Sequence, residues 1–517
     1  MVLKQIGFLN KMKYALAAIL VFGLLISCNN AVNTEGPGAE LPNIKHYVSI
    51  DGLWRCTPET ASKFPHGTLE YIIHISDDAP GEKTARGCFV REGRFFDYWE
   101  IDSFQFNECS GKVVFTDNEG GKYIGTIDQV KKTIKGYFSP DDDDPTDTMK
   151  LDFVRDQAID LTRFFIPYPT EQDGSIIYSY HQPEKCNDQI QTASMFEFVE
   201  DSSAFFNFME KIIKQKFGRL ESFLIIKDQE LVLEEYFYGF SRTQLHRINS
   251  CTKSIISLLL GITLEHHKIL DIEQPVFNFF PQYDSLITPE KEKISIKHLV
   301  TMTAGFPEED DFEAHDPDDL VKKILSQPLV SAPGEHFKYN NNNTNLLGSL
   351  IYALENKQAD EFAKEVLFNR LGIADFYWEE ENGLLQCHNG LYMYPRDMAK
   401  IGLLVLNDGM WNGEEIVPKK WITESTKPYV SESVFFDYGY QWWYRSKRNS
   451  SWWDDPVHGS NDEHDMILAL GFGGQYIMIV KDMNLVIVIT SSDNNENNGK
   501  ALQKVSMVIE YVEPLFD

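Results

Sequence analysis

The stretch from His246 to Ile262, HRINSCTKSIISLLLGI, constrains the fold of this chain more than any other. Its second half is an apolar run of helical length, and a run of this kind has to be buried inside a domain. Two polar side chains, Ser250 and Lys253, lie just ahead of it, one helical turn apart and on one face. The pattern predicts a hydroxyl and an amine within reach of each other at the start of a buried helix.

Such a pair can transfer a proton and so activate the serine as a nucleophile. A lysine withdrawn from water keeps its amine partly neutral, so the amine can accept a proton from a neighbouring serine. The helix N-terminus stabilises the negative charge that then develops on the serine oxygen. Because Ser-x-x-Lys also arises by chance in long chains, the competing interpretation is a surface lysine at a helix start.

Two later segments favour the chemical interpretation. PGEHFKYNNNNTNLLGSLI supplies Tyr339 and Asn341 as a Tyr-x-Asn motif ahead of another apolar run, and ALGFGGQYIMIV supplies a glycine-rich strand entry. With these three motifs in this order, the region from Phe196 to the C-terminus resembles the serine β-lactamase and penicillin-binding-protein superfamily. The resemblance is to its class C-like branch, which includes family VIII esterases, 6-aminohexanoate-dimer hydrolases and D-alanyl-D-alanine peptidases.

The resemblance implies a role for each motif residue. Ser250 would be the acylated nucleophile and Lys253 its close partner. Tyr339 would complete the general base, with a phenol kept partly ionised by the adjacent ammonium, and would protonate the leaving group. Asn341 would orient the lysine or the substrate amide, and the backbone N–H groups of Ser250 and Phe472 would form an oxyanion hole.

The third motif departs from the family pattern. Relatives usually carry Lys or His, then Thr or Ser, then Gly, whereas this chain has Ala469, Leu470 and Gly471. A methyl group thus stands where relatives hold a substrate carboxylate, so we expect short esters or uncharged amides to be better substrates than β-lactams or D-Ala-D-Ala peptides. Arg445 or Lys447 could in principle supply the missing cation.

The resemblance and the hydrophobic periodicity together define the expected fold. We expect an α/β (α+β) transpeptidase-like domain over residues 158–517, in which helices flank an antiparallel sheet and a helical subdomain is inserted. A helix and a hairpin at each end indicate that both ends of this region contribute to one sheet. Residues 45–157 alternate polar and apolar side chains between short turns, which predicts a small all-β accessory barrel or sandwich.

The N-terminus has the features of a targeting segment. Lysines precede the apolar stretch YALAAILVFGLLIS, which is too short for a permanent membrane span. It ends in Leu-Ile-Ser-Cys, which resembles the lipobox of bacterial lipoproteins. We therefore expect a signal peptide over residues 1–27, lipidation of Cys28 and a tether over residues 28–44. An ordinary secretory signal with a chance cysteine is the alternative.

Composition excludes some classes of binding partner. The formal net charge of −30 argues against nucleic acid, because phosphate binding needs basic surface. The acidic run Asp141 to Asp144 and the histidine pairs have no metal-ligand spacing, so we expect no metal and no organic cofactor. The remaining cysteines form no framework pattern, and Cys251 fits a small buried side chain. Four tryptophans could line a substrate pocket or simply pack: Trp442, Trp443, Trp452 and Trp453.

The sequence thus predicts an exported serine hydrolase, lipid-anchored to a bacterial membrane at the periplasmic or cell surface. Its partners would be that membrane and a small ester, amide or peptide substrate. Two alternatives remain open: a D-alanyl-D-alanine carboxypeptidase or β-lactamase, and a penicillin-binding-like sensor that does not turn over.

Overall fold

The structure is a computed structural model of the 517-residue chain. It describes residues 52–57, 62–64, 67–79, 82–91, 94–99, 101–107, 110–117, 121–128, 132–139, 148–155, 178–307, 317–381, 384–431, 436–447, 463–492 and 498–516. The predicted signal peptide, Cys28 and the tether lie outside these residues. Within them, no helix combines the length and the apolar character that crossing a bilayer requires.

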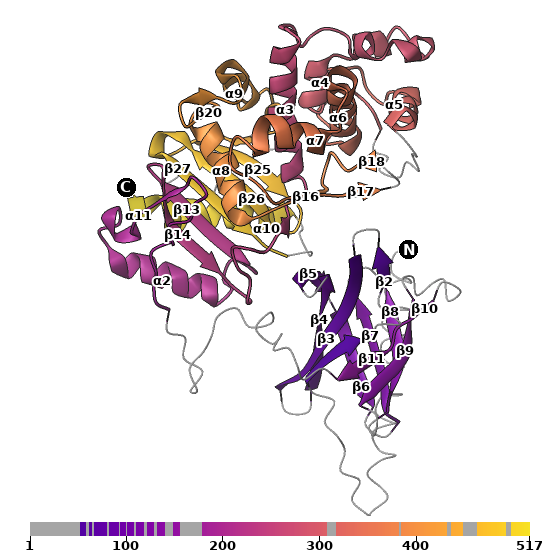
Figure 1. Cartoon of the computed structure of the whole chain (residues 1–517), viewed down its shortest axis with the longest axis vertical. Helices are drawn as coiled ribbons and strands as arrows, with labels where there is room; N and C mark the ends of the chain where they lie inside the picture. The colour runs from indigo at the N-terminus through magenta and orange to yellow at the C-terminus, as the bar shows by residue number, and fades with distance from the viewer. Residues whose placement is uncertain are drawn as a thin grey trace, which may run out of the picture. The chain divides into compact units, whose positions relative to one another are not determined.

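The first described part is an antiparallel sheet. Its strands are β1 (Gly52–Cys56), β2 (Ser62–Phe64), β3 (Gly67–Ala79), β4 (Glu82–Arg91), β5 (Arg94–Trp99), β6 (Ile101–Asn107), β7 (Lys112–Asp117), β8 (Lys122–Asp128), β9 (Thr133–Ser139), β10 (Met149–Lys150) and β11 (Phe153–Arg155). They follow the order β5-β4-β3-β1-β11-β9-β8-β7-β6. Since β4 and β6 also lie close together, the sheet rolls up on itself (Figure 1). This confirms β structure here.

Alternation of side chains decides which face of this sheet is inside. Phe115 of β7 and Tyr123 of β8 are buried and stacked, with ring centroids 4.7 Å apart. Trp54 and Phe153 are buried beside them. Because successive residues of a strand point to opposite faces, the residues between these positions point outward.

The second described part contains a mostly antiparallel sheet built from both ends of that part. In spatial order its strands are β12 (Gln191–Thr192), β14 (Glu230–Tyr236), β13 (Ser222–Lys227), β27 (Leu485–Thr490), β26 (Gln475–Val480), β25 (Met466–Gly471), β24 (Trp443–Arg445), β23 (Asp437–Tyr438) and β22 (Val430–Ser431). Strand β13 pairs with β27 along its whole length, which confirms the predicted joining of the two ends. Every residue of β26 and β27 is buried, so both faces of the sheet are covered.

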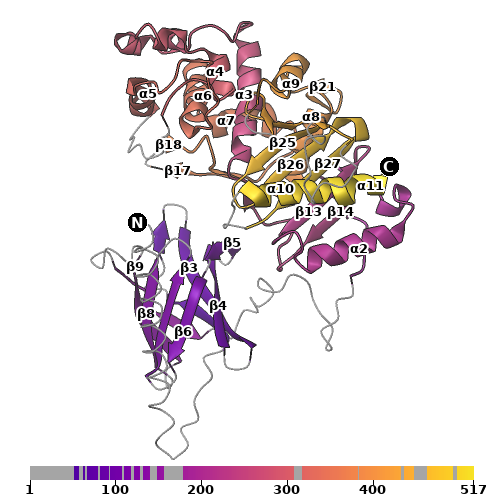
Figure 2. The same cartoon turned by 180° about the vertical axis from the view of Figure 1, so that it is seen from behind.

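Helices cover the two faces of this sheet (Figures 1 and 2). One face packs on α2 (Ser202–Ile213) and α10 (Asn498–Met507), and the other on α3 (Cys251–His266) and α8 (Pro395–Leu406). The helical insert comprises α4 (Ile296–Val300), α5 (Pro317–Ser326), α6 (Asn341–Glu355), α7 (Ala359–Ala363) and α9 (Lys419–Ser425). The predicted α/β transpeptidase-like architecture is confirmed.

Short elements complete the description. They are the strands β15 (His246–Arg247), β16 (Tyr377–Trp378), β17 (Glu380–Glu381), β18 (Leu384–Leu385), β19 (Leu391–Met393), β20 (Met410–Trp411) and β21 (Glu414–Glu415). The short helical turns are η2 (Met195–Glu197), η3 (Val276–Phe279), η4 (Pro281–Leu286), η5 (Lys291–Lys293), η6 (Lys364–Phe368), η8 (Lys481–Met483), η9 (Val508–Val512) and α11 (Glu513–Phe516).

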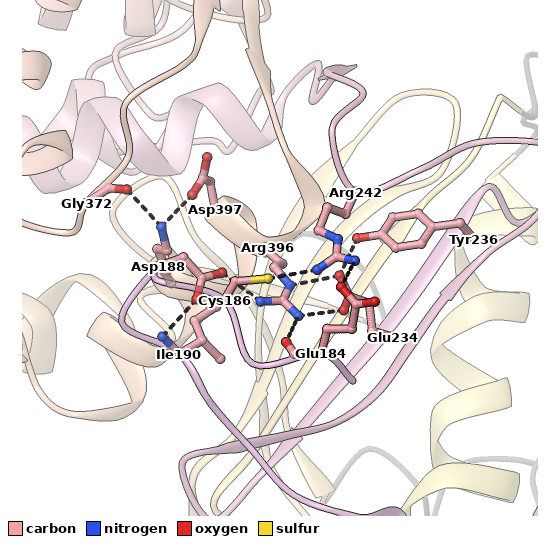
Figure 3. A network of polar contacts seen from close by, with 11 residues as sticks. Glu184, Cys186, Asp188, Ile190, Glu234, Tyr236, Arg242, Gly372, Arg396 and Asp397 are labelled. Carbon is pink, nitrogen blue, oxygen red and sulfur yellow. Dashed lines mark hydrogen bonds and ion pairs between the residues drawn. The ribbon is translucent and has the colours of Figure 1, made fainter. Parts of the chain in front are cut away.

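A buried ion network joins the segment ahead of β12 to the sheet and to α8 (Figure 3). Arg396 of α8 donates two hydrogen bonds to the carboxylate of Glu234 on β14, at 2.8 and 2.6 Å. It donates another to Asp188 at 2.8 Å and one to the carbonyl of Glu184 at 2.7 Å. Four of the five N–H donors of this guanidinium are thus hydrogen-bonded, which compensates for burying a side chain that is only 5% exposed.

Candidate active site

Ser250 lies at the start of α3, in a turn that the adjacent strand holds in place. Asn249 adopts a left-handed conformation with φ 46°, which turns the chain just before the helix begins. Its side-chain amide donates to the carbonyl of Phe472 at 2.8 Å. A Cβ added to Gly471 would lie 2.3 Å from the carbonyl oxygen of Ile248, so only glycine lets β25 end this close to the turn.

Lys253 is the centre of the polar contacts at this turn. Its side chain is 1% exposed, and its Nζ lies 3.3 Å from the hydroxyl of Ser250. The same atom donates to Oδ1 of Asn341 at 2.8 Å and to the carbonyl of His388 at 2.9 Å. Three oxygen acceptors match the three N–H bonds of an ammonium group. The predicted helical pairing of serine and lysine is present, and the lysine is not a surface residue.

Tyr339 approaches the same serine from the segment before α6. Its phenol is hydrogen-bonded to the side chain of Ser250, and its ring centroid lies 4.8 Å from Nζ of Lys253. Burial raises the pKa of Tyr339 well above its ordinary value, and the hydrogen bond to Ser250 only partly opposes this rise. This direction favours a neutral resting phenol, whereas the resemblance implied a phenol kept partly ionised by the adjacent ammonium.

Aromatic rings hold Tyr339 in place. Trp443 of β24 stacks on it, with centroids 5.7 Å apart and an interplanar angle of 21°, and Tyr438 packs against its edge at 6.2 Å. Trp442, in contrast, is fully buried in the core. The sequence left open whether these tryptophans line a substrate pocket or pack in the core. Trp443 supports the site through Tyr339, and Trp442 packs in the core. Trp452 and Trp453 lie outside the described residues.

The third motif also reaches this turn. Ala469 of β25 is fully buried in the same hydrophobic cluster as Ile255 of α3. Gly471 is buried at the end of the strand, whereas the side chain of the following Phe472 is 55% exposed. The structure therefore brings residues from all three predicted motifs to the N-terminal end of α3.

Strand register shows that Arg445 does not replace the cation missing at Ala469. Arg445 pairs with Met466, and paired residues of antiparallel strands point to the same face. Met466 packs in the cluster on the opposite face of the sheet from Ala469. It also lies three positions back along β25, about 10 Å away. Lys447 lies farther along the chain, where its N–H donates to Asp465 at 2.9 Å.

His388 is the site residue that sequence reasoning missed. It contributes its backbone carbonyl to Lys253, and its ring Nδ1 lies 3.1 Å from Oδ1 of Asn345 on α6. Burial, together with the charges of Lys253 and Arg247, lowers the pKa of His388 to about 3. The imidazole is therefore neutral at physiological pH. A carbonyl acceptor leaves no signal in a sequence, since every residue has one.

The other features discounted at the sequence level form no site in the described residues. His464 contacts Asp482, whereas His266 and His267 both contact Glu355. No group of three or more metal-ligating side chains occurs in these parts of the chain.

Burial raises the pKa of the Cys251 thiol well above its ordinary value, which makes the thiol unreactive. Among the described residues, Cys186, Cys251 and Cys387 form no disulfide. His458, Asp141 to Asp144, and the side chains of Cys88 and Cys109 lie outside the description.

Comparison with known proteins places the second described part of the chain in a known family. The family model described as beta-lactamase matches residues 218–507. The 6-aminohexanoate-dimer hydrolase of Paenarthrobacter ureafaciens is 22% identical over 274 residues, which cover 47% of this chain and 68% of that protein. Protein flp of Staphylococcus aureus strain COL is 29% identical over 147 residues, which cover 25% of this chain and 29% of that protein.

Solved structures of penicillin-binding protein homologues are also similar. One from Caulobacter crescentus has a TM-score of 0.48 and 14% identity, covering 60% of this chain and 97% of its own. The octameric homologue from Pyrococcus abyssi has a TM-score of 0.45 and 18% identity, covering 59% of this chain and 76% of its own.

Proposed function

The chain belongs to the beta-lactamase family, and we propose that it is a serine hydrolase that cleaves an ester or amide through an acyl-enzyme on Ser250. One observation carries the proposal. The hydroxyl of Ser250 contacts both Nζ of Lys253, at 3.3 Å, and the phenol of Tyr339. A nucleophile that touches two proton-transfer groups is the arrangement that acyl transfer requires.

In acylation, the oxygen of Ser250 forms a bond to the substrate carbonyl carbon while its proton passes to the Lys253 and Tyr339 pair. The bond from that carbon to the leaving oxygen or nitrogen then breaks, and the pair returns the proton to the leaving group. The first acceptor in this scheme is Lys253 in its neutral amine form, 3.3 Å from the serine hydroxyl. The neutral phenol of Tyr339 then gives its proton to the leaving group and regains one from the protonated Lys253. In deacylation, water replaces the serine oxygen and the proton follows the reverse path.

The negative charge that develops on the substrate carbonyl oxygen during acyl transfer needs hydrogen-bond donors. We assign this role to the backbone N–H groups of Ser250 and Phe472, each worth about 3 kcal/mol of transition-state stabilisation. The side-chain bond from Asn249 to the carbonyl of Phe472, at 2.8 Å, supports the assignment because it fixes the Phe472 peptide beside the start of α3.

The third motif supports a neutral substrate. Ala469 presents a methyl group, and the register of β24 directs Arg445 to the other face of the sheet. We therefore propose short esters or uncharged amides as substrates. The similarity to a protein named 6-aminohexanoate-dimer hydrolase supports a hydrolytic reaction. A carboxypeptidase or β-lactamase would bind a free carboxylate there, and no cation described at this position favours either.

The test uses the chain without residues 1–27. The wild-type protein should turn over an activated ester and be labelled covalently by a fluorophosphonate, and Ser250→Ala should lose both. Ser257→Ala is a matched control, since this buried hydroxyl of the same helix has no hydrogen-bond partner in the described part of the chain and its loss should change neither. Labelling that persists unchanged in Ser250→Ala would exclude the proposed nucleophile. Labelling without turnover in the wild type would identify the non-hydrolysing sensor instead.

We also propose, from the N-terminal sequence alone, that the protein is exported and anchored to a bacterial membrane through a lipid on Cys28.

A further inference from the structure

The outer face of the first sheet carries an exposed apolar row. Register places Gln105, Val114, Ile124, Tyr137 and Lys150 side by side across β6, β7, β8, β9 and β10. Paired residues share a face, so their side chains form one continuous row. At its centre Ile124 is 45% exposed and Tyr137 is 57% exposed. These two side chains form a cross-strand pair, which stabilises the sheet and also leaves an apolar centre open to solvent.

Lysines surround this row. Lys122 lies in the neighbouring row on one side, Lys112 and Lys135 lie in the row on the other side, and Lys150 ends the central row. The other positions of these two flanking rows carry serine, threonine or asparagine, and none of the described positions in the three rows carries a carboxylate. We call this surface the lysine-ringed face; it comprises Val114, Ile124, Tyr137 and the four lysines.

This face stands out against the charge of the whole chain. The chain has 78 acidic and 48 basic residues, a formal net charge of −30. Among the described residues, carboxylates lie at the margin of the face: Asp152 pairs with Lys150 at 3.0 Å, and Asp128 ends β8. A group of lysines without interspersed acids is therefore a local reversal of the overall charge, and such a reversal favours an anionic partner.

We propose that the lysine-ringed face docks on an anionic lipid bilayer. Lysines at such a surface attract anionic headgroups, while tyrosine and aliphatic side chains enter the boundary between headgroups and acyl chains. A soluble polyanion would use the lysines but would have no need of Ile124 and Val114 at the centre. The apolar centre is the observation that favours a bilayer over a polysaccharide.

The geometry and the charge of the chain are compatible with this docking. The face is a sheet surface whose long lysine side chains can extend outward around the apolar centre. Repulsion between the bilayer and distant carboxylates is screened beyond about 8 Å at physiological ionic strength, whereas lysines in contact with headgroups are not. Ordinary salt therefore reduces the opposing force more than the attraction.

The inference does not depend on the proposed hydrolase, although it complements the proposed lipid anchor. The sheet begins at Gly52, and the predicted lipidation site Cys28 precedes it in the chain. A lipid at Cys28 would keep this part near a bilayer, and the lysine-ringed face would then orient it. The test accordingly uses protein without any lipid, so that failure of the anchor and failure of the face are separable.

The experiment measures co-sedimentation with vesicles. The chain lacking residues 1–28 should bind vesicles of phosphatidylglycerol and phosphatidylethanolamine and not vesicles of phosphatidylcholine, and binding should weaken as salt rises. Lys112→Glu with Lys135→Glu should weaken binding by about 25-fold or more, since each lysine near an anionic surface contributes about fivefold. Ile124→Ser with Tyr137→Ser should weaken binding about tenfold or more.

Matched controls lie on the second described part. Lys268→Glu with Lys293→Glu reverses two other exposed lysines, and Leu270→Ser removes a side chain that is 78% exposed; both should bind like the wild type. Every variant should keep wild-type circular dichroism and hydrolysis of a soluble ester, and Ser250→Ala should bind vesicles normally. The proposal is overturned if the paired face variants bind like the controls. It is also overturned if dextran sulfate binds as tightly and only the lysine pair matters, which would identify a polyanion site.

Discussion

At the scale of single residues, Lys253 determines the chemistry of the site. Its Nζ meets oxygens from the helix start, from Asn341 of α6 and from the loop that holds His388. A buried amine with three oxygen atoms within hydrogen-bond distance is held in one position, and it can accept a proton from Ser250 only in its neutral form. Proton transfer from Ser250 therefore has to be coupled to Tyr339, whose phenol contacts the same hydroxyl.

This coupling predicts non-additive kinetics. Lys253→Ala and Tyr339→Phe should each slow acylation by about 10² to 10⁴. The double variant should lose far less than the product of the two effects, because removing either member already disables the shared path. Pre-steady-state kinetics with an activated ester measure the acylation rates of the wild type, the two single variants and the double variant. Circular dichroism is the folding control. Strictly multiplicative losses would show that the two residues act independently, and normal rates for Tyr339→Phe would remove the tyrosine from the mechanism.

Ala469 sets the expected substrate preference. A carboxylate opposite its methyl group lacks a charge-assisted hydrogen bond worth roughly 1.5 to 3 kcal/mol, or about ten- to hundredfold in affinity. The wild type should therefore have a higher kcat/KM for a neutral ester than for nitrocefin or a D-Ala-D-Ala peptide, and Ala469→His should narrow the gap.

Ala469→Leu is the control for this substitution, because it adds bulk to the same fully buried position without adding a donor. It should lower activity toward all substrates alike. Wild-type cleavage of either carboxylate substrate at or above the ester rate would instead favour the β-lactamase or carboxypeptidase alternative.

At the scale of secondary-structure elements, β14 carries two adjacent carboxylates with different environments. Glu234 accepts a bidentate hydrogen bond from Arg396 of α8, while Glu235 accepts one from the phenol of Tyr178 at 2.7 Å. Burial, which the hydrogen bond from Tyr178 partly opposes and the charge of Glu234 reinforces, raises the pKa of Glu235 to about 7. The arginine joins α8, β14 and Asp188 of the preceding segment, so these elements should unfold as one unit.

The raised pKa of Glu235 predicts a pH dependence of stability. Between its ordinary pKa of 4.5 and about 7 the folded state keeps a proton that the unfolded state has lost. The free energy of unfolding should therefore fall as the pH rises through this range, by roughly 1 to 3 kcal/mol. Glu235→Gln should flatten the decrease and stabilise the protein at pH 8.

Urea denaturation at several pH values between 5 and 8 measures this effect. Glu265→Gln is the matched control, since the Glu265 side chain is 52% exposed and its loss should leave the slope unchanged. An identical slope in the wild type and Glu235→Gln would assign the pH dependence to other groups.

At the scale of the whole molecule, the described residues form a rolled β sheet and an α/β domain, and a targeting sequence is proposed for the N-terminus. The described helices include none that could span a bilayer. We propose two contacts with a membrane, the lipid at Cys28 and the lysine-ringed face.

The lipid anchor has a direct test. Full-length protein expressed in a bacterium should fractionate with membranes and incorporate labelled palmitate. Cys28→Ser should abolish the labelling and release most of the protein in high salt, because the remaining contact is electrostatic and screened. Cys56→Ser, which changes a buried thiol, should still be labelled. Cys28→Ser protein that remains membrane-bound in high salt would indicate a different anchor.

The sequence by itself determined the features that depend on local periodicity. A helix has 3.6 residues per turn, so Ser250 and Lys253 had to share a face wherever the helix was placed. Alternation along the strands likewise determined the inward and outward faces, and the hairpins at both ends of the second part predicted its shared sheet. The order of the motifs added Tyr339 and Asn341 to the predicted site through resemblance to a family. No local periodicity could predict that they lie beside Lys253.

Only the tertiary structure decided what depends on distant neighbours. The carbonyl of His388 became a ligand of Lys253 because the loop that carries it packs beside α3, and carbonyls are identical along a sequence. The neutral state of Tyr339 follows from burial, which depends on every residue packed around the phenol. Arg445 was excluded from the pocket by the register of β24 against β25, and strand register is fixed by long-range pairing.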